Sequence, residues 1–591
     1  MSTIKVDTIV DEAGTGAPNF TQGASVSGNL SVDGGTIKLD GNYPVGTGNV
    51  ALGDVALSNG SLSGGGNTAI GSYNLNSNTT GVSNSAFGYG PMGYNTSGSY
   101  NTALGSDTLK YNTTASNNTA VGYQAGYSNT TGAALTAIGY VALTNNTTGN
   151  YNTAFGYEAG KGNTTAQLNT FIGFEAGRGT TTGAVNTIVG GRAMKIATTA
   201  ESNTGLGYGV LGLTTTGSEN VAVGRDAMTG NTTGSYNVSL GRNALYNNTT
   251  ASENVAVGYR AMLTNTTGAD NTAVGADSMY DNTTGQKNAA FGKASLGDNT
   301  TGDFNVAIGP YAMRLNTTAS NNTAVGYQAG YTNTTGVSST FIGRKAGYAT
   351  TTGTQNLFVG ADAGFDNTTG SGNTYVGRGF NTAAGVLMTT GSKNTIIGGF
   401  SGNQGGLNIR TSSNNIVLSD GEGDPYMYLQ HGGTNQWILN ANGSVVNAYG
   451  NGRECVTLQQ NYGSGTQYFT YHRYGSNNVG SITSTGSSTS YNTTSDYRLK
   501  ENVVELTGAT DRLKQIPVHR FNFIADADTT VDGFLAHEVQ TVVPEAVVGT
   551  HNEVDDDGAA VMQGIDQSKL VPLLVKTIQE LEARITALEG A

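Results

Sequence analysis

The stretch Asn118-Thr119-Ala120-Val121-Gly122 recurs along the chain at a fixed step of 17 residues. Nineteen copies begin between residues 67 and 373; 17 of them begin with asparagine, and all 19 have glycine at their fifth position. A constant short period means that each unit forms one turn of a solenoid, in which equivalent residues stack along the axis. The sequence therefore predicts a mainly β protein built on an elongated β-solenoid.

Each 17-residue unit contains the residues that strands and corners need. Residues 118–121 are compatible with a short strand, Gly122 permits a sharp corner, and residues 129–132 (NTTG) tolerate positive φ. We therefore expect two short strands and two corners in each unit. Stacking would place the asparagine side chains about 4.8 Å apart, within reach of a hydrogen-bonded ladder.

Two sets of apolar residues mark different faces of the unit. The third and eighth positions are usually alanine, as at Ala120 and Ala125, which predicts close packing of another chain against that face. The fourth position carries larger residues, as at Val121, Ile138, Phe155 and Ile172. After Gly377 the next matches are Asn394 and Asn415, so the step lengthens and we expect the register to be lost.

Over residues 49–377 the repeat resembles the head region of trimeric autotransporter adhesins, whose similar units form a β-roll. The resemblance implies a homotrimer. We therefore assign residues 49–415 to a trimeric β-solenoid shaft, which is either an inert spacer or a surface that binds glycans.

Composition argues against several classes of partner. The net charge of −13 and the lack of a basic run argue against nucleic acid as the ligand. The single cysteine, Cys455, cannot form an intrachain disulfide, and no metal-ligand spacing is present, so we expect no metal and no cofactor. No stretch approaches the roughly 18 apolar residues of a membrane span, and residues 1–21 lack a secretory signal. We expect synthesis in a cytoplasm without membrane insertion.

Aromatic residues gather after the repeats, in residues 416–494. Two interpretations stay open: a β-rich neck whose aromatics fill its core, or a receptor-binding tip on which sugars stack. The residues concerned are Tyr426, Tyr428, Trp437, Tyr462, Tyr468, Phe469, Tyr471 and Tyr474.

The last hundred residues differ in composition, since charges and helix formers return. Four segments follow in order: residues 494–502 (TSDYRLKEN), 533–540 (GFLAHEVQ), 543–547 (VPEAV) and 568–574 (SKLVPLL). Together they closely resemble the intramolecular chaperone and auto-processing domain of phage endosialidases and tail fibres. The resemblance implies that residues 495–591 fold with α and β elements, drive trimerisation and then release themselves.

The resemblance also implies a cleavage site, the bond between Thr494 and Ser495, with Ser495 as nucleophile and Lys500 as its base. The chemistry is coherent because a serine hydroxyl needs a neighbour that takes its proton, and a desolvated lysine can do so. Any such reaction is a single turnover, and we predict no other enzymatic activity. The alternative is that Ser495 caps a turn and Lys500 is a solvated charge.

The two ends of the chain complete the prediction. Residues about 571–589 carry apolar residues at alternating spacings of three and four, which predicts a coiled coil: Val571, Leu574, Ile578, Leu581, Ile585 and Leu588. Residues 2–10 (STIKVDTIV) and 14–20 (GTGAPNF) resemble the N-terminus of tail fibres from marine and cyanobacterial phages. The resemblance implies that residues 1–48 attach to a phage tail or baseplate protein.

These expectations combine into a virion tail fibre that adheres to a glycan or protein receptor on the host surface. One alternative is a tailspike enzyme that degrades host polysaccharide, although no pair of carboxylates facing one cleft stands out. Another is a bacterial trimeric surface adhesin, which would need export and an anchor.

Overall fold

The computed structural model describes residues 47–378, 382–430, 436–439, 467–474, 477–485, 488–524, 526–555 and 558–590. The chain divides into two compact units, Met1–Val445 and Val446–Ala591. The predicted attachment region, residues 1–48, lies outside the described residues except for its last two. No helix in the described ranges is both long enough and apolar enough to cross a membrane.

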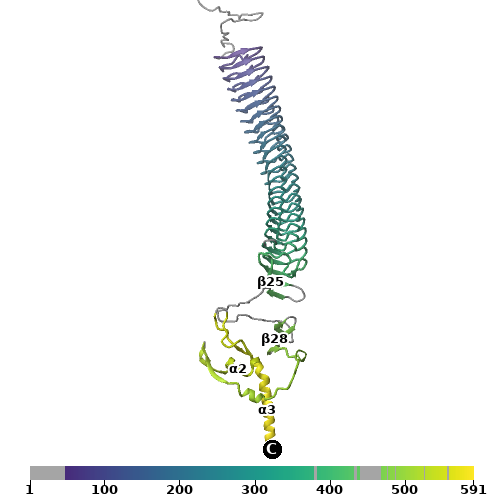
Figure 1. Cartoon of the computed structure of the whole chain (residues 1–591). Coiled ribbons are helices and arrows are strands. Elements are labelled where there is room, and N and C mark those ends of the chain that lie inside the picture. The colour runs from purple at the N-terminus through teal and green to yellow at the C-terminus, as the bar shows by residue number, and fades with distance from the viewer. Residues whose placement is uncertain are drawn as a thin grey trace, which may run out of the picture. The chain divides into compact units, whose positions relative to one another are not determined.

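In its described residues, the first unit forms a stack of 22 parallel strands, as the solenoid prediction requires (Figure 1). Each strand pairs in register with the next, for example Ala120 with Ala137. The strands are β1 (Val50–Leu52), β2 (Thr68–Ile70), β3 (Ser85–Phe87), β4 (Thr102–Leu104), β5 (Thr119–Val121), β6 (Thr136–Ile138), β7 (Thr153–Phe155), β8 (Thr170–Ile172), β9 (Thr187–Val189), β10 (Thr204–Leu206), β11 (Val221–Val223), β12 (Val238–Leu240), β13 (Val255–Val257), β14 (Thr272–Val274), β15 (Ala289–Phe291), β16 (Val306–Ile308), β17 (Thr323–Val325), β18 (Thr340–Ile342), β19 (Leu357–Val359), β20 (Thr374–Val376), β21 (Thr395–Ile397) and β24 (Ile416–Ser419).

Each 17-residue turn contains one three-residue strand rather than the two strands expected. The rest of the turn is a chain of tight bends, and four non-strand positions adopt positive φ in most units, as at Gly122 (125°), Gln124 (51°), Leu109 (49°) and Asn117 (63°). The bends still bond to the neighbouring turn, since Gly122 N donates to Leu104 O at 2.8 Å. The second expected strand is therefore replaced by turns that stack with the same period.

Two asparagine ladders run inside the stack. In the first, Asn84 Nδ2 donates to Asn67 Oδ1 at 3.1 Å and to Gly98 O at 2.9 Å. In the second, formed by the Asn-Thr-Thr triplets, Asn112 Nδ2 donates to Asn95 Oδ1 at 2.8 Å. Both sets are buried. Because a buried amide without a partner is costly, these bonds explain why asparagine recurs at each step.

The alanines of the unit face inward, so the prediction that another chain packs against them is wrong. Ala120, the middle residue of β5, is 1% exposed, and Ala125, in the bend that follows, is fully buried, because both lie in the narrow interior of their own turn. The last residue of each strand points outward instead, and none from β1 to β21 is buried, Phe155 for example being 54% exposed. We call this outward row of apolar residues the apolar stripe.

The register continues past Gly377, contrary to expectation. β20 pairs with β21 through Thr374 and Thr395, and β21 pairs with β24 through Thr395 and Ile416. Both steps are 21 residues, and the second contains the extra hairpin β22 (Asn403–Gln404) and β23 (Leu407–Asn408). Longer turns preserve the ladder because the strand and its two flanking bonds are unchanged, as in Thr374 N to Asn394 O and Gly398 N to Val376 O.

Two antiparallel strands close the shaft sheet: β25 (Pro425–Gln430) pairs with β24, and β26 (Gln436–Leu439) pairs with β25. Tyr428 packs against the shaft core, whereas Tyr426 is 53% exposed. The other aromatic side chains assigned to a neck or tip lie outside the described part of the structure: Trp437, Tyr462, Tyr468, Phe469, Tyr471 and Tyr474.

The second unit combines strands and helices. Its elements are β27 (Gln467–Tyr474), β28 (Asn477–Thr485), β29 (Ser488–Thr493), the 3₁₀ turn η1 (Tyr497–Leu499), α1 (Ala509–Leu513), β30 (His519–Phe523), β31 (Asp526–Gly533), α2 (Ala536–Val542), η2 (Pro544–Ala546), β32 (Val547–Val548), β33 (Gly564–Ile565), η3 (Gln567–Leu570) and α3 (Val571–Glu589). A small core joins α1, α2, η2 and the start of α3, and its buried members are Ala509, Ile516, Val539, Val543, Ala546, Leu570 and Leu573.

Candidate self-processing site and ligand pocket

The turn η1 brings the ends of the segment 495–500 together. Asp496 caps the turn, since its carboxylate accepts a hydrogen bond from Arg498 N at 2.9 Å. The guanidinium of Arg498 also donates to this carboxylate, which holds the pKa of Asp496 below its ordinary value. Lys500 N then closes the turn on Tyr497 O at 3.0 Å.

Closure of this turn places Lys500 against Ser495. Lys500 Nζ donates a hydrogen bond to Ser495 Oγ across 2.7 Å, within the reach needed between a base and a nucleophile. Both side chains are exposed in the single chain. The structure therefore brings together the two residues assigned to the dyad, and Ser495 directly follows Thr494 at the expected cleavage point.

The segment that follows the dyad is held by α3. Lys576 Nζ bonds Glu505 at 2.6 Å. The Glu580 carboxylate accepts from Ala509 N at 2.9 Å, from Thr510 N at 2.8 Å and from the Thr510 hydroxyl at 2.6 Å. These donors lower the pKa of Glu580 to about 2, with the Thr510 hydroxyl as the largest cause. Glu580 thus caps the N-terminus of α1, whose first N–H groups otherwise lack acceptors.

Sequence reasoning did not identify Glu580. Its partner Thr510 lies 70 residues earlier, and a glutamate on the polar side of a predicted coiled coil carries no signal of such a role. The contact of His519 Nε2 with Glu538 at 2.5 Å, which ties β30 to α2, was likewise not predicted.

Helix α3 has two different faces. Leu573 and Thr577 are buried against the domain core. The six residues predicted for a coiled coil are all exposed, between 42% and 79%: Val571, Leu574, Ile578, Leu581, Ile585 and Leu588. One face therefore belongs to the domain, and the other is an exposed apolar row.

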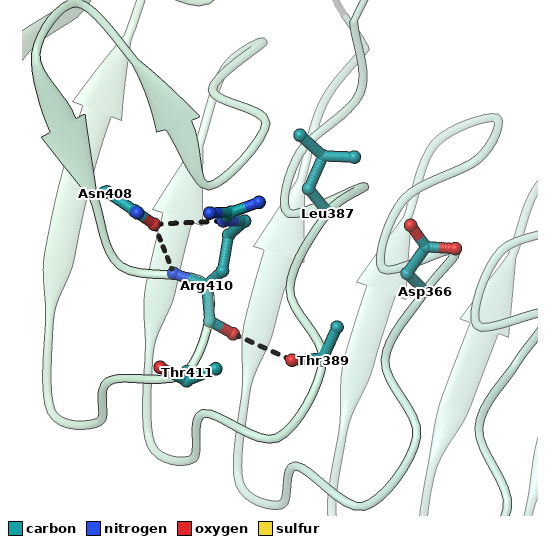
Figure 2. Close-up of a pocket in the computed structure, with 6 residues that line it drawn as sticks. All are labelled: Asp366, Leu387, Thr389, Asn408, Arg410 and Thr411. Atoms are coloured by element: carbon teal, nitrogen blue, oxygen red, sulfur yellow. Dashed lines mark hydrogen bonds between the residues drawn. The ribbon is translucent and has the colours of Figure 1, made fainter.

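A separate hollow of about 300 Å³ lies on the shaft where its turns lengthen (Figure 2). Part of its lining comes from residues in the two 21-residue turns. Its lining residues are Asp366, Leu387, Thr389, Asn408, Arg410 and Thr411. Asn408 ends the extra hairpin, so the interruption of the 17-residue step was a sequence signal for this pocket.

The pocket presents a positively charged donor, Arg410, and a negatively charged acceptor, Asp366. Arg410 Nε donates to Asn408 Oδ1 at 3.1 Å, and the Thr389 hydroxyl donates to Arg410 O at 3.4 Å. Among the described residues, the Asp366 carboxylate has no hydrogen-bond or ion-pair partner, and burial raises its pKa. A carboxylate and a guanidinium beside the exposed Leu387 suit a ligand with neighbouring hydroxyl groups and an apolar face.

Comparison with known proteins adds one finding. A model of the family described as "Chaperone of endosialidase" matches residues 495–548, which begin at Ser495 and extend through β32. No curated protein and no solved structure matches the chain. The C-terminal segment is therefore similar to an endosialidase chaperone, which supports a role in trimerisation and autoprocessing.

Proposed function

We propose that this chain is a phage tail fibre whose residues 495–591 act as an intramolecular chaperone, assemble three chains and then cut before Ser495. The observation that carries the proposal is the 2.7 Å contact between Lys500 Nζ and Ser495 Oγ at the start of the matched segment. The fibrous shaft supports it as well, because long stacks of non-local β pairs fold slowly and benefit from a chaperone.

The cut follows from ordinary acyl chemistry. Neutral Lys500 takes the hydroxyl proton of Ser495, and Oγ attacks the carbonyl carbon of Thr494. The C–N bond between the two residues breaks, the nitrogen receives a proton, and an ester joins Thr494 to Ser495 Oγ. Water then hydrolyses the ester, which leaves a carboxylate on Thr494 and a free amine on Ser495.

Assembly of the trimer would determine when this reaction occurs. A lysine accepts a proton only in its neutral form, and burial favours that form. Ser495 and Lys500 are exposed in the single chain. Cover by neighbouring chains would therefore activate the dyad after trimerisation rather than before it.

Two exposed apolar rows support the homotrimer. One is the apolar stripe of the shaft; the other is the row on α3 that includes Ile578 and Ile585, 64% and 54% exposed. Rows of this length rarely stay open to water on a folded protein. β-Branched residues alternating with leucine favour two helices in isolated coiled coils. The much longer shaft, whose repeat resembles trimeric adhesin heads, would instead set the number of chains at three.

Adhesion to a host-surface receptor is the second part of the proposal, and the pocket around Asp366 and Arg410 favours it. The alternative of a polysaccharide-degrading tailspike needs two carboxylates on either side of a glycosidic bond. Among the described residues, Asp366 is the only acidic one that lines this pocket. The pocket therefore suits binding of a saccharide better than its hydrolysis. Attachment of residues 1–48 to a tail or baseplate protein, and location in the virion, complete the proposal.

The test compares three chains: the full sequence, the Ser495→Ala variant and a chain that ends at Thr494. Mass spectrometry should find the full chain divided into two parts and the Ser495→Ala variant intact at 60.5 kDa. Light scattering should find trimers for both, and no trimer for the chain that ends at Thr494 when it is synthesised without its chaperone. An intact wild type would overturn the cleavage, and a trimer formed without residues 495–591 would overturn the chaperone role.

A further inference from the structure

Four cations gather on one part of an acidic shaft. Lys161, Arg178 and Lys195 occupy the same position in three consecutive units, each 17 residues after the last, and Arg192 lies beside them. Because adjacent parallel strands are about 4.8 Å apart, three like charges are stacked at close range. The whole chain has a net charge of −13, so this concentration of positive charge is a local exception.

Two buried glutamates lie beneath the cations. Glu158 contacts Lys161 at 2.9 Å and Arg178 at 2.6 Å, while Glu175 contacts Lys195 at 3.0 Å. Both carboxylate side chains are 10% exposed. Hydrogen bonding from Lys161, with the charges of Lys161 and Arg178, lowers the pKa of Glu158. These contacts hold the cations in fixed positions over the two carboxylates.

The charges of this cluster do not cancel. Four cations (Lys161, Arg178, Arg192 and Lys195) and two carboxylates leave a net charge of 4 − 2 = +2. Elsewhere on the described shaft, ion pairs join one cation to one carboxylate, as in Arg260 with Asp277 at 2.8 Å. A network of ion pairs that only stabilised the fold would need no excess positive charge.

The surface beside the cations is open. A hollow of about 440 Å³ crosses these turns, and its lining includes Lys161, Arg178 and Lys195. Gly162 and Gly179 also line it, at a position where other units have larger side chains such as Tyr111. The hollow thus has a backbone floor and a row of fixed cations, and the remaining lining residues are Asn145, Ile196 and Thr198.

We infer that this hollow, here called the basic groove, binds an acidic polysaccharide, with its cations on successive carboxylate or sulfate groups. Cationic donors form strong hydrogen bonds to such groups, and Lys and Arg held by Glu158 and Glu175 lose little freedom on binding. The groove runs over several turns, which suits a polymer better than a small ion. This inference rests on the proposed adhesive role and adds the chemical class of one ligand.

The test uses the full chain with polygalacturonate, dextran sulfate, neutral dextran and a single-stranded thymidine oligonucleotide as probes. The double variant Lys161→Gln with Lys195→Gln removes two cations and leaves Arg178 and Arg192 to neutralise the two glutamates. The control, Lys287→Gln with Lys393→Gln, removes the same charge from exposed shaft positions outside the groove. Thermal unfolding confirms that each variant keeps the shaft.

We expect the wild type to bind at least one acidic polysaccharide, and the groove variant to bind it roughly tenfold more weakly, as expected for the loss of charge-assisted hydrogen bonds. The control variant should retain wild-type affinity, and neutral dextran should not bind. Equal losses in both variants, tighter binding of the oligonucleotide, or no binding of any acidic polymer would overturn the inference. If the fibre still attaches to host cells while ignoring acidic polymers, the inference fails but the adhesive role stands.

Discussion

The ring of Phe171 occupies the space that a side chain at Gly177 would need. A Cβ added at Gly177 would lie 2.1 Å from Cδ1 of Phe171. The same relationship joins Phe358 to Gly364, at 2.6 Å. Where the strand centre is alanine, as at Ala103, the position corresponding to Gly177 can instead carry a buried leucine, Leu109. The interior of each turn has a limited volume, which either the strand or the bend fills.

This complementarity predicts an unfolding series. Phe171→Ala should destabilise the shaft by about 3–5 kcal/mol, because it leaves a cavity. Gly177→Leu alone should also destabilise it, through overlap with the ring. The double variant should lose less unfolding free energy than the two single variants lose together, since Leu109 already occupies the equivalent site at a φ of 49°. Chemical denaturation measures the unfolding free energies of the three variants. Additive losses would contradict the idea that the strand and the bend share one interior volume.

The corner glycines predict a second effect on the shaft. Gly224 has a φ of 130°, and a Cβ there would lie 2.6 Å from Gly241 O in the next turn. Gly224→Val should therefore distort one turn and lower the unfolding temperature. Gly60→Val is the control, because a Cβ at Gly60 has no atom within 4 Å. Equal behaviour of the two variants in a thermal melt would show that the corner does not require glycine.

The dyad predicts a difference between two basic residues. Lys500→Arg keeps a positive hydrogen-bond donor beside Ser495, but a guanidinium stays protonated and cannot serve as a base. Self-cleavage should therefore stop, while assembly continues. Lys514→Arg, at an exposed position of the same unit, should cleave like the wild type. Gel electrophoresis over time measures both, and undiminished cleavage of the Lys500→Arg variant would exclude Lys500 as the base.

The Glu580 cap predicts an acid-sensitive domain. The pKa of Glu580 is about 2 in the folded domain, below the value of about 4.3 for an unfolded glutamate. The carboxylate therefore contributes its full stabilisation above about pH 4.3 and loses it as the pH falls toward 2. Glu580→Gln should lower the stability of the domain at neutral pH. It should also reduce the loss of stability between about pH 4.3 and pH 2.

Glu582→Gln provides the matched control for that experiment, because Glu582 is exposed on the same helix. Circular dichroism of the full chain, recorded between pH 5 and pH 2, follows unfolding of the C-terminal unit and compares the two variants. If Glu580→Gln and Glu582→Gln unfold alike at every pH, the hydrogen bonds to Thr510 do not stabilise α1.

The exposed row on α3 predicts an effect on subunit number. Ile578→Glu places a charge in the centre of the proposed coiled coil and should weaken trimer formation. Ala583→Glu adds the same charge at an exposed position outside the row and should leave the trimer intact. Light scattering at several concentrations compares the two. An unchanged trimer for Ile578→Glu would assign trimerisation to other surfaces.

Local features of this protein could be predicted from its sequence. The 17-residue step determined the stack of turns because each solenoid turn contacts only its neighbours, so one unit such as 118–134 defines the next. The asparagine ladders followed from the same repeat. Ser495 and Lys500 meet because only a short turn separates them, and such a contact depends little on the rest of the fold.

Features that depend on volume or on distant contacts were decided by the tertiary structure. The sequence did not reveal that Ala120 faces inward and Val121 outward, because alternation along a strand separates two faces without saying which one the turn encloses. Glu580 reaches Thr510 across 70 residues, and no local pattern encodes that distance. The basic groove likewise exists only because stacking aligns residues 17 apart, since charges that are far apart along the chain become neighbours when the turns close.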